Sequence, residues 1–366
     1  MKTVLHIITD ANIGGAGILL LNLLAAREKY DMEVALPEGS QLIPRLDALN
    51  VPYHEVPHVE ARSVSVKGIS PLVRVIYERE ADVVHTHAAF SGRVAAKWCK
   101  TPIVHTRHCI FEPIPGDERF RKKLLQRFVN QYFADAIIAV SPAVKDDLVR
   151  TGTRAEQVTV VFNGTPETPV RTADERLAIR QRYNVPQQAF VVAQVARLVD
   201  VKGHDYTLDA AKILQNEKDI VFLLAGTGPI EAHLHARVRD EGLTNVIMPG
   251  FVEAVEDVTN ITDLHLVASY GTETCSLAKL EAMCLGIPAV VTDFGGNPYV
   301  ITDGYNGAIV PVKNGKALAE AIRTIKNDPV LCQKLGQNAK IDYENRFRST
   351  RMAQEVEAVY DKVLKR

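Results

Sequence analysis

Two glutamates, Glu273 and Glu281, stand out in this sequence, and seven residues separate them. On a helix this offset is roughly 12 Å along the axis, because each residue rises about 1.5 Å. The two carboxylates are therefore too far apart to share a proton, but they suit two distant parts of one long ligand. The backbone amides from Thr274 to Leu277 would lie at a helix N-terminus, which favours a phosphate group. A nucleotide sugar, with hydroxyls at both ends and a diphosphate between them, has this shape.

A strand and a helix must position these two groups. Residues 263–268 are mostly apolar and predict a buried strand. Residues 277–285 have helical composition, and Gly286 and Pro288 then end the helix. Glu273 therefore falls in a strand-to-helix turn, and Glu281 lies about two helical turns later.

The stretch from Ala268 to Pro298 resembles the E-x7-E signature of retaining GT-B glycosyltransferases of family 4, also called glycosyl transferases group 1. Three flanking strings match the same family pattern: Glu281-Ala282-Met283, Gly286-Ile287-Pro288 and Asp293-Phe294-Gly295-Gly296. The sequence departs from the usual pattern at two places. A glycine and an aromatic residue usually follow the first glutamate, and a second glutamate usually stands at the position of Tyr299; here Glu273 is followed by Thr274-Cys275-Ser276-Leu277.

The resemblance implies a role for each glutamate. Glu273 would bind hydroxyls of the donor sugar, and Glu281 would bind the ribose. Ser276 would add a hydroxyl to the phosphate site, beside Thr274, Cys275 and Leu277. The alternative for Glu281 is an exposed charge on the helix surface. The neighbouring residues in the sequence are apolar, which argues against this alternative.

Two cations follow the first strand of the second half of the chain, Arg197 and, five residues later, Lys202. Cations at the carboxyl end of a first strand suit a diphosphate, and they would stabilise the charge that grows on a departing nucleoside diphosphate. On spacing alone, two surface charges in a loop would be the favoured interpretation. The resemblance favours the diphosphate, since R-x4-K-G at this place is the family's diphosphate-binding pair.

Glycine-rich loops supply the other expected donor contacts. Gly14 and Gly15 precede an apolar helix, and by residue type alone this loop is either a tight turn or a ligand loop. The resemblance places such a Gly-Gly loop near the diphosphate and the acceptor. It also implies that the donor is lined by Asn163, Gly226, Gly228 and, near the base, Phe251.

We expect catalysis without a metal or other cofactor, and a UDP-sugar as the donor. The chain has no D-x-D triplet, which metal-dependent transferases use to hold a divalent ion on the diphosphate. The H-x-H spacing of His85 and His87 on a strand would be compatible with a metal site. No third ligand with suitable spacing is evident from the sequence.

Histidines near two strand ends are the expected sugar and acceptor contacts. By resemblance, His105 matches the family histidine that contacts the transferred sugar. His87 and Arg107 lie where acceptor contacts would fall. His108 is either a further acceptor contact or a simple loop residue. The alternative for each histidine is a core residue paired to a backbone carbonyl, and for His85 we prefer it.

Composition and length limit the class of protein. The chain has 366 residues, enough for two domains, with 46% hydrophobic and 24% charged residues. Its formal net charge of -1 argues against a nucleic-acid partner held by bulk electrostatics. The five cysteines form no C-x-x-C pair, and we see neither a basic-then-apolar leader nor an apolar run of roughly 20 residues. We therefore expect free thiols and a cytoplasmic protein.

Short apolar, β-branched runs alternate with helical patterns along the chain, which predicts an α/β fold with parallel sheets. The polar, proline-rich segment 163–169 is the expected linker. We expect a Rossmann-like acceptor domain over 1–165 and a nucleotide-sugar-binding domain over 166–345. The resemblance implies GT-B architecture, in which two such domains face each other across a cleft, and a last helix, about 346–366, that packs back on the first domain. The expected strands are 3–9, 33–36, 81–85, 103–106, 136–140, 158–162, 190–195, 221–226, 246–249, 264–269, 289–292 and 308–310.

Residues 118–132 carry Phe120, Leu124, Phe128 and Tyr132 at steps of four, with five basic residues around them. This pattern fits a basic amphipathic helix on an anionic membrane at the inner face of the cell. It also fits a core-packed helix with a solvated basic face.

The sequence thus favours a retaining glycosyltransferase of the hexosyl or N-acetylhexosaminyl type. It would move a sugar from a nucleotide-diphosphate donor to a hydroxyl of a glycan or lipid-linked acceptor, in cell-surface polysaccharide or glycoconjugate synthesis. Two alternatives remain: a nucleotide-sugar 2-epimerase on a related fold, and a non-catalytic nucleotide-sugar-binding protein.

Overall fold

The computed structural model describes residues 1–59, 64–110 and 118–365, and of residues 118–123 it describes the backbone only. The chain divides into two compact units. Unit 1 comprises Met1–Pro166 and Phe347–Arg366, and unit 2 comprises Glu167–Arg346.

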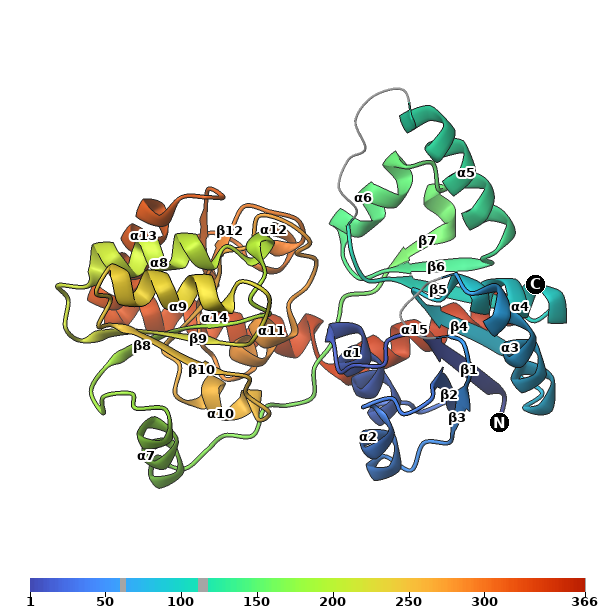
Figure 1. The fold of residues 1–366 in the computed structure, drawn as a ribbon, viewed down its shortest axis with the longest axis horizontal. Coiled ribbons are helices and arrows are strands. Elements are labelled where there is room, and N and C mark those ends of the chain that lie inside the picture. The colour runs from blue at the N-terminus through green and yellow to red at the C-terminus, as the bar shows by residue number, and fades with distance from the viewer. Residues whose placement is uncertain (60–63, 111–117, 366) are drawn as a thin grey trace. The chain divides into compact units, whose positions relative to one another are not determined.

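The described residues of unit 1 form a seven-stranded parallel sheet in the order β3-β2-β1-β4-β5-β6-β7 (Figure 1). Its strands are β1 (Thr3–Ile8), β2 (Asp31–Pro37), β3 (Tyr53–Val56), β4 (Val83–His87), β5 (Ile103–Arg107), β6 (Ala136–Ala139) and β7 (Val158–Val160). Its α-helices are α1 (Gly15–Ala25), α2 (Ile43–Ala48), α3 (Val66–Glu78), α4 (Phe90–Cys99), α5 (Glu118–Tyr132), α6 (Pro142–Arg150) and α15 (Ser349–Leu364).

Unit 2, all of whose residues are described, holds a six-stranded parallel sheet in the order β10-β9-β8-β11-β12-β13. Its strands are β8 (Phe190–Val195), β9 (Ile220–Ala225), β10 (Val246–Gly250), β11 (Leu264–Val267), β12 (Ala289–Thr292) and β13 (Gly307–Val310). Its α-helices are α7 (Ala173–Arg182), α8 (His204–Leu214), α9 (Glu231–Asp240), α10 (Val255–Asn260), α11 (Leu277–Cys284), α12 (Asn297–Val300), α13 (Gly315–Asn327) and α14 (Pro329–Arg346).

Both sheets have the strand order of doubly wound folds, in which ligands bind at the carboxyl ends of the strands where the order reverses. The core of unit 2 shows why its strands are almost wholly apolar. Val192 of β8 belongs to one buried cluster, while its neighbours Val191 and Ala193 belong to another. Successive residues of a strand point to opposite faces, so helices cover both faces of this sheet. The α/β prediction with parallel sheets is confirmed.

One strand of unit 1 was missing from the sequence prediction. β3 (Tyr-His-Glu-Val) pairs only with β2, at the edge of the sheet, and is largely half-buried or exposed. A short edge strand needs no apolar run, so composition gave no signal for it. The last helix, α15, contacts α1, β5 and β6 of unit 1. Tyr30 Oη and Lys29 Nζ both donate to Asp361 on this helix.

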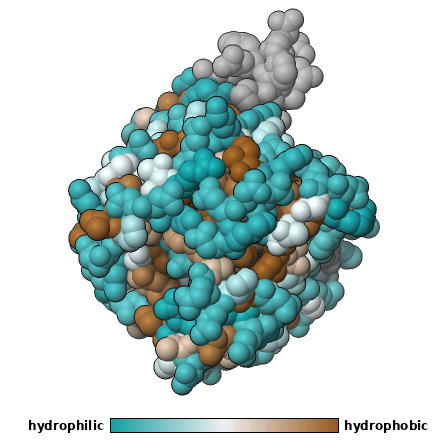
Figure 2. Space-filling view, turned by 90° about the vertical axis from the view of Figure 1, so that its left-hand side faces the viewer, coloured by the Kyte–Doolittle hydropathy of each residue, from teal (hydrophilic) through white to brown (hydrophobic). Residues whose placement is uncertain are grey.

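The face of the molecule in Figure 2 is mainly hydrophilic, with hydrophobic side chains scattered in small groups. This pattern agrees with the number of charged residues in the chain, 43 basic and 44 acidic, since charged side chains are mostly exposed.

Candidate functional site

Glu273 lies in the turn between β11 and α11 and is only 4% exposed. Its Oε2 accepts hydrogen bonds from Lys202 Nζ and Ser269 Oγ, each at 2.9 Å. Burial alone would raise the pKa of this carboxyl, but the charges of Lys202 and Lys279, with these hydrogen bonds, lower the pKa below its ordinary value. Glu273 is therefore ionised at neutral pH.

Lys202 ends the 3-10 turn η2 (Asp200–Lys202) at the carboxyl end of β8. The next residue, Gly203, has φ +72°, and a Cβ there would lie 2.0 Å from the carbonyl oxygen of Ala268. Glycine is therefore required for the loop after β8 to approach the end of β11. This close approach brings Lys202 to Glu273.

Arg197 lies in the same loop and is exposed. The loop after β9 packs around it, since Cβ atoms on Gly226 and Gly228 would lie 2.0 Å and 2.3 Å from the carbonyl oxygens of Ala196 and Leu198. The structure therefore brings the loop that contains Gly226 and Gly228 against the backbone on both sides of Arg197.

Ser276 caps α11, because its side chain accepts a hydrogen bond from a backbone amide of the first turn. Thr274 and Cys275 are buried, while Ser276 and Leu277 are half-buried. The glycine loop after β12 holds this turn from the other side, since Gly296 N donates to the carbonyl oxygen of Glu273 at 3.1 Å. The start of α11 is thus fixed by packing and hydrogen bonds before any ligand binds.

Glu281 lies further along α11 and is half-buried, so it is not a bare surface charge. Among the described residues its Oε2 is buried without a hydrogen-bond partner. Burial, together with repulsion from Glu256, raises the pKa of Glu281 to about 7. A buried carboxylate whose oxygen lacks a partner is a candidate binding group.

Phe251, which follows β10, is 72% exposed.

In unit 1, Gly14 is the N-cap residue of α1, and a Cβ on Gly15 would meet no other atom within 4 Å. Asn163 is buried and lines a small cavity together with His85, His87 and Thr106. The structure therefore groups Asn163 with the histidines of unit 1.

His105, on β5, is 7% exposed, and its Nδ1 lies 3.2 Å from the carbonyl oxygen of Thr86. Burial and the nearby cations Arg93 and Arg107 lower its pKa well below the ordinary value. The imidazole is therefore neutral, with the proton on Nδ1 and an acceptor at Nε2. Pairing to a carbonyl is the core arrangement that the sequence left open, and it still leaves one nitrogen for a ligand.

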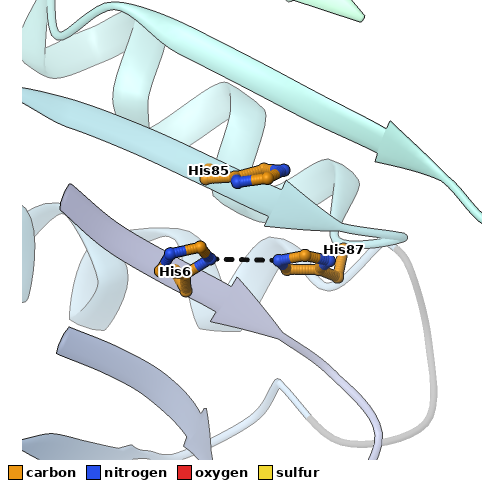
Figure 3. Close-up of side chains that lie close together, drawn as sticks. All are labelled: His6, His85 and His87. Carbon is orange, nitrogen blue, oxygen red and sulfur yellow. Dashed lines mark hydrogen bonds between the residues drawn. The ribbon is translucent and has the colours of Figure 1, made fainter. Parts of the chain in front are cut away.

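Four other histidines of unit 1 form a neutral polar network. Figure 3 shows His6 of β1 beside His85 and His87 of β4, with a hydrogen bond between His6 Nδ1 and His87 Nε2 at 3.1 Å. The other nitrogen of His87 lies 3.0 Å from His108 Nε2. His85 contacts the hydroxyls of Tyr360 at 2.6 Å and Thr106 at 2.7 Å. Burial lowers the pKa of each of these four histidines.

The residues that the sequence predicts to contact the acceptor are held by different interactions. Both ring nitrogens of His87 are engaged by other histidines, so an acceptor contact would first require one of these bonds to break. Arg107 donates to the carbonyl oxygen of Cys109 at 2.9 Å and lies 3.7 Å from Asp147. His85 is a core histidine, as preferred, but its partners are hydroxyls instead of a carbonyl.

Two family models match the chain, one in each unit. The model described as Glycosyltransferase Family 4 matches residues 13–168, and the model described as Glycosyl transferases group 1 matches residues 175–342. The chain belongs to glycosyltransferase family 4. The matches cover the E-x7-E stretch in unit 2 and most of the sheet in unit 1.

Relatives and solved structures agree with this family. A D-inositol 3-phosphate glycosyltransferase of Streptomyces bingchenggensis is 29% identical over 70% of this chain, which spans 62% of that relative's length. A UDP-Gal:alpha-D-GlcNAc-diphosphoundecaprenol alpha-1,3-galactosyltransferase of Escherichia coli is 23% identical over 92% of this chain and 90% of its own. The Anabaena protein HepE, solved with UDP and glucose, superposes with a TM-score of 0.87 at 22% identity, over 99% of this chain and 100% of its own. The fold of this glycosyltransferase is therefore GT-B.

Two members of these sites were missed in the sequence. Lys279 looks like an ordinary helix lysine, and His6 like one polar residue in a strand. The register that places His6 opposite His85 was the missing information. With it, three histidines in the described residues offer ring nitrogens within 4.8 Å of one another. Both nitrogens of His85 already contact hydroxyls, however, and we interpret the cluster as a hydrogen-bonded network. That the enzyme needs no metal stays a prediction.

The apolar side chains on the second half of α5 do not pack into the core. Leu124, Leu125, Phe128 and Tyr132 are 50–62% exposed, which contradicts the core-packed alternative for these residues. The side chains of Phe120, Arg121, Lys122 and Lys123 lie outside the described residues. In the part of the chain that the structure describes, no helix is long and apolar enough to cross a membrane.

The buried histidines predict a loss of stability in acid. The pKa of His6 is lowered from 6.5 to about 3, so below pH 6.5 only the unfolded chain takes up this proton. Stability is thus unaffected above pH 6.5 and falls by about 1.4 kcal/mol per pH unit for each such group as pH drops toward the folded pKa. Urea unfolding of unit 1, followed by hydrogen exchange in peptides of β1 and β4, should show this between pH 7.5 and 5. His6→Leu should reduce the slope by about 1.4 kcal/mol per pH unit, and the exposed His235→Leu should leave it unchanged; equal slopes in all three proteins would contradict the assignment.

Proposed function

We propose that this glycosyltransferase moves a sugar from a nucleotide-diphosphate donor to a hydroxyl of a glycan or glycolipid acceptor. The observation that carries the proposal is the buried, ionised Glu273 held by Lys202 where the ends of β8 and β11 meet. An anionic carboxylate is suited to sugar hydroxyls, and Arg197 in the same loop is exposed for the diphosphate. Glu281, with its unpartnered buried oxygen, would receive the ribose hydroxyls.

A UDP-sugar is the proposed donor, and a hexose or N-acetylhexosamine the proposed sugar. The HepE structure with UDP and glucose and the UDP-galactose donor named for the Escherichia coli relative support this choice. The lipid-linked acceptor named for that relative supports a role in cell-surface polysaccharide or glycoconjugate synthesis. Gly14, Gly15 and Asn163 remain proposed donor contacts, and His105 a proposed contact of the transferred sugar through Nε2.

Transfer would retain the anomeric configuration and use no metal. As the bond between sugar and diphosphate breaks, Arg197 and Lys202 stabilise the charge on the leaving phosphate, which then takes the proton of the attacking hydroxyl. The carboxylate of Glu273 is engaged by Lys202 and Ser269, which suits a binding role better than a covalent nucleophile.

Replacing Glu273 tests its role in sugar recognition. Glu273→Gln should lower kcat/KM for transfer by about 100-fold or more, since a charged acceptor of sugar hydroxyls is lost in the transition state. The affinity for UDP alone should change little, because UDP carries no donor sugar. Isothermal titration with UDP and a coupled transfer assay measure the two quantities. The exposed Glu344→Gln is the control, and a Glu273→Gln enzyme with the parent's turnover would remove Glu273 from the site.

The pKa of Glu281 predicts a pH-dependent donor affinity. At a pKa of about 7 the carboxyl is mostly protonated at pH 6 and mostly ionised at pH 8, and only the ionised form accepts two ribose hydroxyls. The affinity for UDP-glucose, whose phosphates do not titrate in this range, should rise roughly tenfold from pH 6 to pH 8. Glu281→Gln should bind more weakly and independently of pH. A flat profile in the parent enzyme would contradict the ribose role.

The stereochemistry and the metal requirement can be checked together. With an α-linked UDP-hexose donor, proton NMR of the first product should show an α-linkage, and EDTA should leave the rate unchanged. A β-linked product would exclude retention. A rate that EDTA abolishes and Mg²⁺ or Mn²⁺ restores would exclude the proposed role of Arg197 and Lys202 as replacements for a metal.

We also propose that α5 contacts an anionic membrane at the inner face of the cell. The exposed side chains of Leu124, Leu125, Phe128 and Tyr132 lie on a helix whose sequence carries five basic residues. Lys97 of the neighbouring helix α4 lies 4.5 Å from the ring centre of Tyr132, and Trp98 beside it is 75% exposed. Apolar and aromatic groups flanked by cations are the composition of interfacial helices.

Liposome sedimentation tests this contact. The parent should sediment with vesicles containing phosphatidylglycerol and not with pure phosphatidylcholine, because the attraction needs anionic lipid. Replacing Arg121, Lys122 and Lys123 by Gln, or Leu124 and Phe128 by Ser, should weaken sedimentation severalfold. Replacing the exposed Lys316, Lys334 and Lys340 by Gln, which removes the same number of positive charges, is the control. If the parent protein does not sediment with anionic vesicles, the membrane proposal fails.

A further inference from the structure

Lys279, on α11, is completely buried. Lysine is rarely buried unless its ammonium is paired, because a bare charge is expensive to remove from water. Here Nζ donates to Asn297 Oδ1 at 2.8 Å. Burial lowers the pKa of the Lys279 ammonium, and the charge of Glu273 opposes this effect. A methionine or leucine would fill the same space, and replacing buried charges by apolar groups is often neutral or stabilising. Stability alone therefore gives no reason for a lysine here.

A continuous set of hydrogen bonds connects Lys279 to Glu273. Asn297 Nδ2 donates to the carbonyl oxygen of Thr292 at 3.0 Å, and the Thr292 hydroxyl donates to the carbonyl oxygen of Ser269. The Ser269 hydroxyl then donates to Glu273 Oε2 at 2.9 Å. The network thus ties α11 and the end of β12 to the carboxylate in the turn.

The same lysine fixes the glycine loop that supports the turn. Asn297 follows Gly295 and Gly296 directly, and a Cβ on these two glycines would lie 2.0 Å from the carbonyl oxygen of Glu273 and 1.5 Å from that of Thr274, respectively. Because these backbone contacts are so close, a shift of Asn297 would also displace the turn at Glu273 and Thr274. Lys279 holds Asn297 in place by its side chain.

The charge of Lys279 also acts on Glu273. Three titratable groups face this carboxyl: Lys202 from the loop after β8, Lys279 from α11, and His265 from β11. Burial, followed by the charge of Lys279, lowers the pKa of His265 to about 3, so this imidazole is neutral and adds no charge. Lys202 and Lys279 thus both oppose the effect of burial on the pKa of this carboxyl.

We propose that Lys279 is a positioning residue for donor-sugar recognition: through its hydrogen bond to Asn297 and the network beyond it, Lys279 holds Glu273 correctly placed for the sugar hydroxyls. This inference rests on the proposed function, since it gives Lys279 its role through Glu273. It assigns no contact between Lys279 and the ligand, because the ammonium is buried.

Two substitutions separate packing from charge. Lys279→Met fills the space without a hydrogen bond, and Lys279→Gln keeps a donor for Asn297 without the charge. The exposed Lys334→Met is the control. With UDP-glucose and UDP-N-acetylglucosamine as probes, kcat/KM for the better donor should fall about 100-fold in Lys279→Met, the scale expected for a misplaced reacting group. The affinity for UDP should stay within about threefold of the parent's.

Two pH readouts distinguish positioning from a merely structural role. Without Lys279 the carboxyl of Glu273 loses one of two cations, so its pKa rises and the acid limb of kcat/KM moves to higher pH in both variants. Carbon-13 NMR of the glutamate carboxyls, assigned with Glu273→Gln, should show the same upward movement for Glu273 without any substrate. If Lys279→Met does not fold, the pH dependence of kcat/KM and the NMR titration of Glu273 are both measured on Lys279→Gln.

The outcomes are distinct. Parent-like kcat/KM and an unmoved Glu273 titration in a folded variant would overturn the proposal. A parent protein that neither binds nor turns over either probe would overturn the proposed function and, with it, the donor role of Lys279; the NMR titration would still show whether Lys279 and Glu273 are coupled. Loss of kcat/KM together with the raised Glu273 titration, at unchanged UDP affinity, is the expected result.

Discussion

The ion pair between Lys202 and Glu273 is the interaction on which the candidate site of unit 2 depends. A carboxylate that is 4% exposed would not remain ionised without cations close by. The two partners come from loops at the ends of β8 and β11, 71 residues apart in the chain. Glycines allow these loops to approach one another in space. Gly203 lets the loop after β8 approach β11, and Gly295 and Gly296 let the loop after β12 approach the turn at Glu273. Close backbone packing at the carboxyl ends of the strands thus brings the charged pair together, at the sheet edge where doubly wound folds bind ligands.

In unit 1 a group of buried histidines is accommodated without charge. His6, His85, His87 and His105 are neutral because burial disfavours the charged form, and each has a hydrogen-bond partner on a neighbouring strand or helix. Tyr360 reaches this network from α15, so the last helix completes the polar core of the first unit.

Much of this arrangement could be predicted from the sequence, because its signals are local. The strand-to-helix turn at Glu273, the helix that carries Glu281 and the alternation of apolar strands are patterns of short range. Lys279 and His6 could not be found in this way. A lysine in a helix becomes a site residue only when α11 packs against the loop at Asn297, and His6 joins His85 only when β1 pairs with β4. The edge strand β3 was missed because an exposed strand needs no apolar pattern.

We propose that unit 2 binds a nucleotide sugar through Glu273 and Glu281 without a metal. The most direct test is ligand-observed NMR with a panel of UDP-, GDP- and ADP-sugars in the presence of EDTA. We expect selective binding of one donor, a UDP-sugar, with base and ribose signals that weaken in Glu281→Gln. Absence of binding by every member of the panel, or binding that neither Glu273→Gln nor Glu281→Gln alters, would contradict it.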